Sequence, residues 1–256
     1  MKIVIPMSGL GKRFADAGYT SVKPLIEVNG KPIIEWVVNL FPGETDFVFI
    51  CRNEHLENTS MRATLDRIAP NSKIIGIEGH KLGPVYAVSK AFEYIDDDEQ
   101  VIVNYCDFYQ DWDYNDFKAW VNSNKVNGAI PCYTGFHPHL LHPKNLYSSC
   151  QIDSNMNLIE IREKYSFEQD KMKAYHSGGT YYFSKGLEVK NYFQKMMDQE
   201  LSLNGEYYVS LVYNLLVEDG LSVKVYDKVP HFCQWGTPED LEEYLTWSEI
   251  IEHYRK

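Results

Sequence analysis

The residues best suited to bind a ligand lie in a glycine-containing loop near the N-terminus. The segment Met7–Arg13 (MSGLGKR) directly follows an apolar run, and Lys23-Pro24 comes ten residues later. The glycines allow backbone N–H groups to approach phosphate oxygens without a Cβ in the way. Arg13 and Lys23 add the fixed cations that a triphosphate with about four negative charges requires. We therefore predict a polyphosphate-binding loop, although turn glycines after a strand are also common without any ligand.

The distribution of charge also indicates an anionic ligand for this segment. The chain of 256 residues has a formal net charge of −11, whereas residues 1–31 carry five cations and only two anions. An acidic protein with a cationic first segment is easiest to explain if that segment meets an anion. Two other kinds of phosphate site do not fit, because the third glycine of a dinucleotide fingerprint and the GxxxxGK[ST] of a P-loop are both absent.

A second candidate is the carboxylate of Asp107, which ends the apolar run 101–106. Ligands of open parallel sheets gather at the carboxyl ends of strands, so a catalytic carboxylate belongs at such a position. Magnesium prefers oxygen ligands and is usually held by one or two carboxylates together with substrate phosphates. Asp107 is therefore the predicted Mg²⁺ ligand. The simpler alternative is that this Asp only ends the strand and has no functional role.

Strands and helices are expected to alternate in the first half of the chain. Short apolar runs predict strands, and the segments between them predict helices. The predicted strands are 2–7, 47–51, 73–77 and 101–106, and the predicted helices are about 32–40, 57–68 and 84–95. Such alternation implies right-handed crossovers and a doubly wound, mostly parallel sheet, which is an α/β fold.

After residue 128 the pattern changes to hairpin strands followed by helices. The predicted strands are 128–134, 147–152, 158–162 and 174–183, and the predicted helices are 187–198, 205–218 and a last one from about 238. We expect one domain over residues 1–256, in which residues 1–127 form a nucleotide-binding core. Residues 128–256 are then a β-rich, acceptor-binding part that ends in a C-terminal helix.

Composition disfavours several other classes of protein. The net charge disfavours nucleic acid and anionic membranes as partners, and no segment approaches the ~18 apolar residues that cross a bilayer. The five cysteines form no CxxC pair and are odd in number, which argues against a zinc site and a full disulfide framework. We therefore expect a cytoplasmic protein. Trp247 on the last helix suits either the core or the interface of a homo-oligomer.

The N-terminal segment resembles the signature of nucleoside-diphosphate-sugar pyrophosphorylases and related cytidylyltransferases. It combines Gly9-x-Gly11-x-Arg13 with Lys23-Pro24 and a second such pair, Lys31-Pro32, that opens a helix. The resemblance implies a Rossmann-like nucleotidyltransferase fold of the GT-A type, with Mg²⁺ at the carboxylate that follows the fourth predicted strand. The implied nucleotide-binding residues are Ser8, Gly9, Leu10, Gly11, Lys12, Arg13, Lys23, Gly79 and Gly83.

Looser resemblances in the second half predict the acceptor site. Glu163-Lys164-Tyr165 resembles an EK(P) element whose lysine meets the phosphate of the acceptor, although a tyrosine replaces the proline. The implied acceptor-binding residues are Lys164, Gly178, Gly179 and Glu206. Many relatives supply a second metal-binding Asp just before a late Gly-Thr, whereas residues 233–237 (CQWGT) contain no carboxylate. Water, the triphosphate or Glu206 would then complete the metal shell.

The resemblance implies a reaction that joins a nucleoside triphosphate to a phosphorylated small molecule and releases pyrophosphate. A phosphate monoester, with a second pKa of about 6, arrives largely deprotonated and needs no catalytic base. Arg13, Lys23 and Lys164 are the predicted catalytic residues, which position the substrates and neutralise their charge. The segments IPMSGLGKRF, GFHPH and QWGTPEDL resemble those of a capsule-biosynthesis branch of the family. This resemblance implies CTP as the nucleotide and a non-sugar acceptor such as phosphoglutamine.

Three alternatives stay open at this point. A pyrophosphorylase of the same family would act on a sugar-1-phosphate. A GT-A glycosyltransferase would bind a nucleotide-sugar and hold its metal with Asp111 and Asp113. A non-catalytic nucleotide sensor would keep the glycine loop and need neither Asp107 nor Lys164.

Two further patterns look like metal motifs but have simpler explanations. Asp111-Trp112-Asp113 lies past a strand end and before a probable helix, where capping is the expected role. The loop with His137, His139 and His142 invites a zinc interpretation, but no cysteine or acid completes a tetrahedral set. A loop near the acceptor explains these histidines better.

Overall fold

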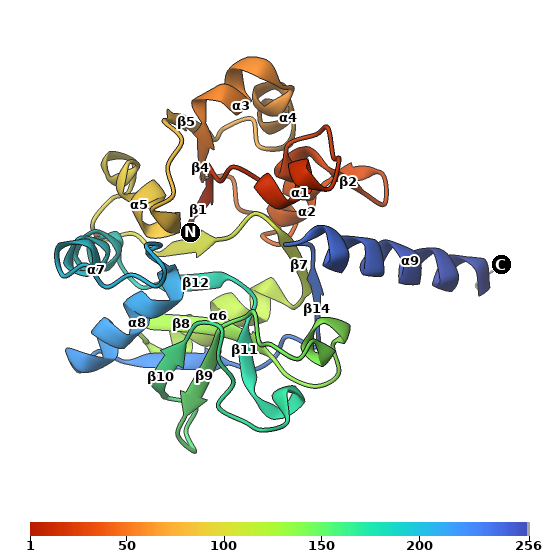
Figure 1. The fold of residues 1–256 in the computed structure, drawn as a ribbon. Coiled ribbons are helices and arrows are strands. Elements are labelled where there is room, and N and C mark those ends of the chain that lie inside the picture. Colours follow the sequence, from red (N-terminus) through yellow and green to blue (C-terminus); the bar gives the residue numbers. More distant parts are fainter. Residues whose placement is uncertain (255–256) are drawn as a thin grey trace.

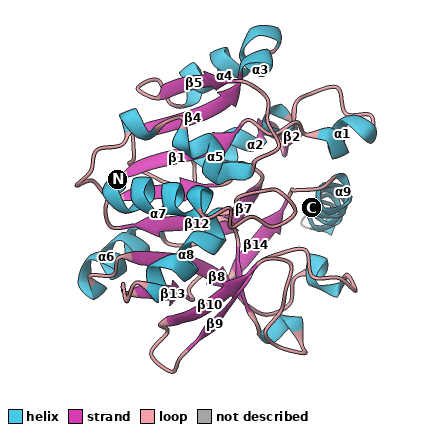
Figure 2. Cartoon of the chain, turned by 60° about the vertical axis from the view of Figure 1, so that its left-hand side comes forward, coloured by secondary structure: helices cyan, strands magenta, loops and turns pink. Residues whose placement is uncertain are grey.

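The computed structural model describes residues 1–254 and contains a ten-stranded sheet with helices on both faces (Figure 1, Figure 2). Its strands are β1 (Lys2–Met7), β4 (Phe47–Arg52), β5 (Lys73–Ile77), β6 (Val101–Asn104), β8 (Gly128–Tyr133), β9 (Ser149–Ile152), β10 (Leu158–Arg162), β11 (Tyr175–Ser177), β12 (Thr180–Phe183) and β13 (Val223–Tyr226). The strand order is β10-β9-β11-β8-β12-β6-β1-β4-β5, and β13 pairs with β8 beside this path.

The first half of the chain forms the parallel part of the sheet. β6, β1, β4 and β5 lie side by side and run in the same direction. The helices of this half are α2 (Ile33–Val38), α3 (Asn53–Asn58), α4 (Met61–Ile68) and α5 (Gly83–Ser89). The alternation of strand and helix therefore builds the α/β fold that the sequence predicts.

The parallel strands are buried on both faces, and alternate residues enter two separate cores. Ile3 of β1 and Phe47 of β4 belong to the core on one face of the sheet. Val4 and Val48 point to the opposite face and pack in a second core with α5. Each such fully buried side chain stabilises the fold by about 1.5–3 kcal/mol, which explains why these strands are nearly continuous apolar runs.

The second half of the chain extends the same sheet. β12 runs antiparallel between β6 and β8. This strand from the second half of the chain therefore pairs with β6, the outer strand of the parallel part. The remaining strands continue the sheet, while α6 (Tyr114–Asn124), α7 (Gly186–Asp198) and α8 (Val209–Glu218) cover its faces. The sheet is thus mixed: four parallel strands come from the N-terminal half, and in the second half only β13 and β8 pair in parallel.

Several small elements surround the carboxyl ends of β1 and β6. They are α1 (Lys12–Asp16), the hairpin β2 (Glu27–Val28) and β3 (Lys31–Pro32), and the antiparallel pair β7 (Phe108–Asp111) and β14 (His231–Gln234). Asn29 and Gly30 have φ of 49° and 78°, as a tight Asn-Gly hairpin turn requires. The last helix, α9 (Pro238–Tyr254), projects from the body (Figure 1). No helix within residues 1–254 is long and apolar enough to span a membrane.

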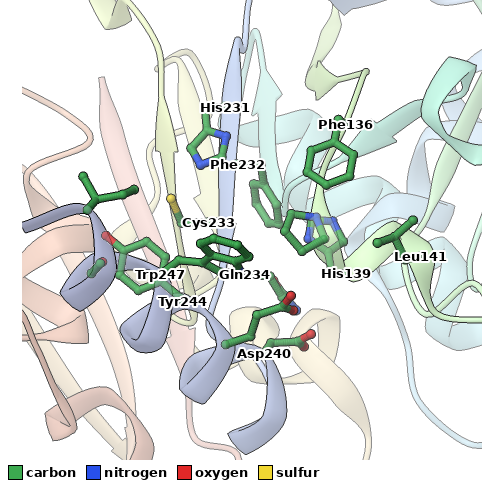
Figure 3. Close-up of a pocket in the computed structure, with 14 residues that line it drawn as sticks. Phe136, His139, Leu141, His231, Phe232, Cys233, Gln234, Asp240, Tyr244 and Trp247 are labelled. Atoms are coloured by element: carbon green, nitrogen blue, oxygen red, sulfur yellow. The ribbon is translucent and has the colours of Figure 1, made fainter. Parts of the chain in front are cut away.

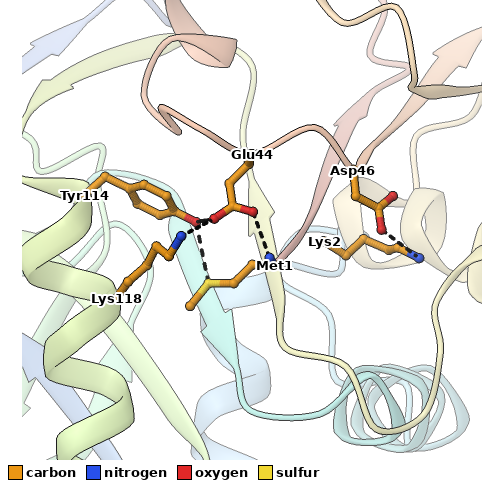
Figure 4. Close-up of polar contacts among 6 residues, drawn as sticks. All are labelled: Met1, Lys2, Glu44, Asp46, Tyr114 and Lys118. Atoms are coloured by element: carbon orange, nitrogen blue, oxygen red, sulfur yellow. Dashed lines mark hydrogen bonds and ion pairs between the residues drawn. The ribbon is translucent and has the colours of Figure 1, made fainter.

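A buried carboxylate ties the loop after α2 to the start of α6 (Figure 4). The Glu44 side chain is 8% exposed, and its carboxylate accepts hydrogen bonds from the Tyr114 hydroxyl at 2.8 Å and from Lys118 Nζ at 2.7 Å. Nearby, Lys2 Nζ lies 3.5 Å from the more exposed carboxylate of Asp46. These contacts fix the end of the sheet opposite to the phosphate loop.

The structure corrects several predicted boundaries. The helix predicted over 57–68 is two helices, because the backbone is extended at Thr59, whose Oγ1 accepts the Met61 N–H at 3.2 Å. The helix predicted over 84–95 ends at Ser89 and is followed by a 3-10 turn. The strand predicted over 174–183 is broken at residues 178–179, and the helix predicted from 205 begins at Val209. The strands β7, β13 and β14 were not predicted.

Candidate active site

A cavity of about 580 Å³ opens at the carboxyl ends of β1 and β6. The loop after β1 forms one wall, and residues 105–107 after β6 form another. The predicted site residues that line the cavity are Ser8, Gly9, Leu10, Gly11, Lys12, Arg13, Lys23, Gly83, Asp107 and Glu206. Residues from distant parts of the sequence therefore meet where an open parallel sheet places its ligands.

The two glycines of the loop after β1 have different surroundings. Gly11 has φ of 61°, a left-handed conformation that L side chains rarely adopt, and precedes α1. At Gly9, apart from Gly9 and its two chain neighbours, no heavy atom within residues 1–254 lies within 4 Å of the position that a Cβ would occupy. The space beside Gly9 is therefore open to a ligand, which is compatible with the predicted phosphate contact.

The predicted phosphate-binding lysine and the predicted metal carboxylate contact each other directly. Lys23 Nζ donates to Asp107 Oδ2 at 2.8 Å and to the Gly236 carbonyl oxygen at 2.8 Å. The ammonium also lies 5.4 Å from the centroid of the Phe14 ring. The lysine side chain is mostly buried, whereas the Asp107 carboxylate is 31% exposed and faces the cavity.

The oxygens around the Lys23 ammonium have the chemistry that a Mg²⁺ ion needs. Asp107 Oδ2 and Gly236 O converge on one positive charge, and magnesium takes such oxygens together with water and phosphate. Residues 1–254 contain no group of three or more His, Cys, Asp and Glu side chains placed to hold a metal. A Mg²⁺ at Asp107 would therefore depend on the nucleotide for part of its coordination.

The DxD pattern lies outside this cavity. Asp113 accepts a hydrogen bond from the Asp116 N–H at 3.0 Å and caps α6, which confirms the predicted capping role. Asp111 is the last residue of β7 and pairs with His231 of β14. The structure therefore does not bring the two aspartates together with the glycine loop.

Glu206 and Lys164 approach the cavity around the ring of Tyr208. Burial, together with the Glu206 carboxylate, raises the pKa of Tyr208, while the Arg13 guanidinium opposes that shift. Lys164 has a left-handed backbone, with φ of 55°, and its Nζ lies 5.8 Å from the Tyr208 ring centroid. Glu206 and Arg13 line the cavity and Lys164 does not, although Lys164 contacts a residue that does.

The carboxyl group of Glu163 fixes the position of the backbone beside Lys164. Ser210 Oγ on α8 donates a hydrogen bond to Glu163, and burial raises the pKa of this carboxyl group. The end of β10 is thereby fixed against α8. The position of Lys164 beside the cavity follows from this anchor.

Two predicted nucleotide-binding glycines also make room for neighbouring protein atoms. A Cβ on Gly79 would lie 2.3 Å from the Arg52 guanidinium. A Cβ on Gly83 would lie 2.7 Å from Tyr207 N, and this close approach joins the start of α5 to the turn that carries Glu206. Gly83 lines the cavity and Gly79 does not.

The predicted acceptor glycines interrupt the sheet rather than line the cavity. A Cβ on Gly178 would lie 2.6 Å from the Phe232 ring, and one on Gly179, where φ is 108°, 3.0 Å from the Tyr105 ring. Tyr105 itself lines the cavity, and its hydroxyl accepts the Val209 N–H at 3.2 Å. The two glycines therefore shape the wall behind Tyr105.

Several lining residues were missed by sequence reasoning. Tyr105, Tyr208 and the Gly236 carbonyl line the cavity without having been predicted to do so. Tyr105 had a usable signal, because it lies two residues before Asp107 in the segment that directly follows β6. For Gly236 the sequence signal was weaker and consisted of the Gly-Thr pair that precedes α9.

A second, more apolar cavity of about 440 Å³ lies between α9, β14 and the loop 136–141. Figure 3 shows the aromatic side chains of α9 and of this loop around it. The loop histidines hold their own segment in place: His137 Nε2 accepts the Phe232 N–H at 3.1 Å, and His139 Nε2 lies 2.8 Å from the Tyr133 hydroxyl. Trp247 is 53% exposed beside this cavity, so it is not a core residue.

Comparison of the whole chain with protein families gives its class. The chain belongs to the family described as the MobA-like NTP transferase domain, whose model matches residues 3–164. It is also 24% identical over 160 residues to the glucose-1-phosphate cytidylyltransferase of Salmonella typhimurium. That match covers 54% of this chain and 61% of the relative, so the chain spans about three fifths of the length of the curated relatives it matches.

Solved structures confirm the fold over nearly the whole chain. A nucleoside-diphosphate-sugar pyrophosphorylase from Vibrio cholerae superposes with a TM-score of 0.78 at 21% identity, covering 95% of this chain and 99% of the other. The inositol-1-phosphate CTP transferase from T. maritima gives 0.73 at 15% identity, covering 97% and 95%. At these identities the likeness is one of fold, and it confirms the predicted nucleotidyltransferase architecture.

Proposed function

We propose that this protein is a Mg²⁺-dependent cytidylyltransferase that transfers CMP from CTP to the phosphate of a small molecule and releases pyrophosphate. The observation that supports this most strongly is the contact of Lys23 with Asp107, which unites a phosphate-binding cation and a metal-binding carboxylate beside the glycine loop. Family membership supports the type of reaction. The cytidylyltransferase activity in the name of the Salmonella relative supports CTP.

In the proposed reaction an oxygen of the acceptor phosphate forms a bond to the α-phosphorus of CTP. The bond from the α-phosphorus to the bridging oxygen breaks, and its electron pair leaves with pyrophosphate. Arg13 and Lys23 neutralise charge on the triphosphate, and Lys164 neutralises the acceptor phosphate. No base is needed, because a phosphate monoester is largely deprotonated at neutral pH.

Asp107 and the Gly236 carbonyl are the proposed protein ligands of Mg²⁺, which when bound neutralises phosphate charge as a Lewis acid. Lys23 Nζ donates a hydrogen bond to each of these two oxygens. Lys23 would exchange them for phosphate oxygens when CTP arrives. The pairing of Lys23 with Asp107 holds both side chains at the cavity.

The proposed acceptor is an amino-acid phosphate such as phosphoglutamine, used in the cytoplasm to modify a capsular polysaccharide. Glu206 supports it, because a carboxylate lining the cavity near Lys164 suits the α-ammonium group of an amino acid whose side-chain phosphate meets Lys164. A sugar-1-phosphate is the second candidate, since the Salmonella relative is named for glucose-1-phosphate. Hydroxyl groups of a sugar would donate to the same carboxylate.

Matched aspartate variants test the assignment of the metal ligand. Asp107→Ala should lower pyrophosphate release from CTP and acceptor by about 10²-fold or more, because it removes the charged oxygen ligand. Asp113→Ala should keep the activity and lose about 1 kcal/mol of stability, because it removes only a helix cap. The reverse sensitivity would support a glycosyltransferase, and CTP binding without pyrophosphate release by the wild type would support a nucleotide sensor.

A further inference from the structure

The last turns of α9 extend beyond the body of the protein (Figure 1). Every residue from 246 to 254 is exposed except Ser248, which is half-buried. Four large side chains of this segment form an apolar stripe, because their spacing places them on one face of the helix: Trp247, Ile250, Ile251 and Tyr254. A helical segment shorter than about 12 residues is marginal in water without packing, so this stripe requires a partner surface.

An open cavity lies beside the apolar stripe. It has a volume of about 440 Å³, and Trp247 and Ile251 form its helix side. Phe136 and Leu141, which are 67% and 63% exposed, line the opposite side (Figure 3). Soluble monomers rarely expose so many large apolar side chains on one patch. A patch that combines a protruding stripe with a cavity can bind a second copy of itself, as a two-fold interface requires.

The charges on the two sides of this cavity are complementary. Residues 238–254 of α9 contain six acids and no lysine or arginine, whereas residues 134–148 contain Lys144, three histidines and no acid. When α9 of one copy lies over this loop of another copy, opposite charges meet, and two-fold symmetry repeats the contact. A membrane surface fits poorly, because anionic headgroups attract helices whose polar face carries lysine and arginine.

We infer that this face is the interface of a two-fold homodimer, in which the apolar stripe of each copy enters the cavity of the other. A second copy is present wherever the chain is present, so it can cover a stripe that needs permanent packing. Trp247 is the central anchor, because large aromatic side chains in desolvated pockets carry much of the binding energy of such interfaces. Within residues 1–254 this cavity shares no lining residue with the main cavity, so the dimer contact is separate from the proposed active site.

Sedimentation velocity of the full-length protein over a range of concentrations tests the interface. The wild type should dimerise, and Trp247→Glu and Ile251→Glu should each raise the dissociation constant of the dimer by about 30-fold or more, because a charge replaces a buried anchor. Leu187→Glu is the matched control, since Leu187 is 42% exposed on α7, and α7 lies on the opposite side of the molecule from α9 (Figure 1). Its dissociation constant should stay within about twofold of the wild-type value.

The proposed charge contact has a separate test. Lys144→Glu should raise the dissociation constant of the dimer about threefold at low salt, because residue 144 faces the acidic helix of the other copy, and added NaCl should reduce this difference. The control is Lys185→Glu at the start of α7, where the ammonium lies 3.7 Å from Asp98. Equal effects of the two substitutions would reflect net charge alone and contradict the contact.

Amide hydrogen exchange of the wild type tests the same interface without a substitution. The amides of residues 246–254 should exchange slowly where the dimer predominates and faster after dilution below its dissociation constant. A wild type that stays monomeric at the highest concentration, or a dimer that Trp247→Glu leaves intact, would overturn the inference. Slow exchange of these amides in a monomer would also overturn it, because the stripe would then need no second copy.

Discussion

At the scale of single residues, the site depends on side chains that the sequence separates and the fold brings together. Lys23 and Asp107 are 84 positions apart, yet their charged groups lie 2.8 Å from each other. Their types and loop positions were predictable from the sequence, because a lysine after a glycine loop and a carboxylate at a strand end each suggest their role. Their direct contact was not predictable, since it depends on packing between segments that share no local pattern.

The two Lys-Pro pairs allow a matched test of Lys23. Lys23→Gln should lower kcat/KM for CTP by about 10²-fold or more, because it removes a fixed cation from the triphosphate and leaves Asp107 without its partner. Lys31→Gln should keep kcat/KM within about threefold, because Lys31 lies outside the cavity, with its Nζ 5.1 Å from the Trp36 ring centroid. Pyrophosphate release measures both. Equal losses in the two variants would contradict the assigned role.

At the scale of elements, the parallel strands were predictable and their later partners were not. β1, β4, β5 and β6 are apolar runs bounded by turns, so their existence follows from the hydrophobic pattern alone. β14 has four residues, HFCQ, and becomes a strand by pairing with β7, more than a hundred residues earlier. Short strands of this kind have no pattern of their own, because the distant partner supplies their hydrogen bonds.

The buried histidines of the loop 136–141 should make stability depend on pH. Burial lowers the pKa of His137 to about 4 and of His139 to about 3. In the unfolded chain both titrate near pH ~6.5, so as pH falls below that value the unfolded state takes up protons that the folded state does not. The free energy of unfolding should therefore fall between pH 6.5 and about 4, by up to ~1.4 kcal/mol per pH unit for each histidine.

Urea unfolding at pH 7.5 and pH 5.5 measures this effect. His139→Phe should lower the slope of the unfolding free energy against pH by up to the contribution of one proton, about 1.4 kcal/mol per pH unit. This change in slope does not depend on how the substitution affects absolute stability. The exposed His142 provides the control, and His142→Asn should leave the slope as in the wild type. A slope that is unchanged in His139→Phe would show that His139 is not buried as a neutral group.

The hydrogen bonds of Glu44, which join the loop after α2 to α6, should stabilise the fold without contributing to ligand binding. Glu44→Ala should cost about 3 kcal/mol, because it leaves Tyr114 and Lys118 without their buried acceptor. Tyr114→Phe should cost about 1 kcal/mol, and Asp46→Ala, at a more exposed pair, less than about 1 kcal/mol. Urea unfolding measures the losses. Calorimetry should find CTP affinity unchanged, since Glu44 lies outside the cavity.

At the scale of the whole molecule, the sheet joins the two halves of the chain into one structure. β12 from the second half pairs with β6 from the first, and the Trp36 and Trp235 rings, one from each half, lie 6.3 Å apart between centroids. We therefore predict a single domain over residues 1–256. Unfolding curves from far-UV circular dichroism and from tryptophan fluorescence should coincide.

A truncated chain provides a sharper test of the same prediction. A fragment of residues 1–127 lacks β12 and exposes the edge of β6, so it should not fold alone and should aggregate. A monomeric, cooperatively folding fragment would show instead that the first half is a domain of its own.

We propose that this protein makes a CDP-linked product from CTP and a phosphorylated acceptor. The most direct measurement is pyrophosphate release by the wild type with Mg²⁺ and each of CTP, UTP, ATP, GTP and dTTP, against phosphoglutamine, phosphocholine and a panel of sugar-1-phosphates. We predict release only when CTP and one acceptor are present together, and none without Mg²⁺. Consumption of a nucleotide-sugar, with no pyrophosphate from any pair, would contradict the claim.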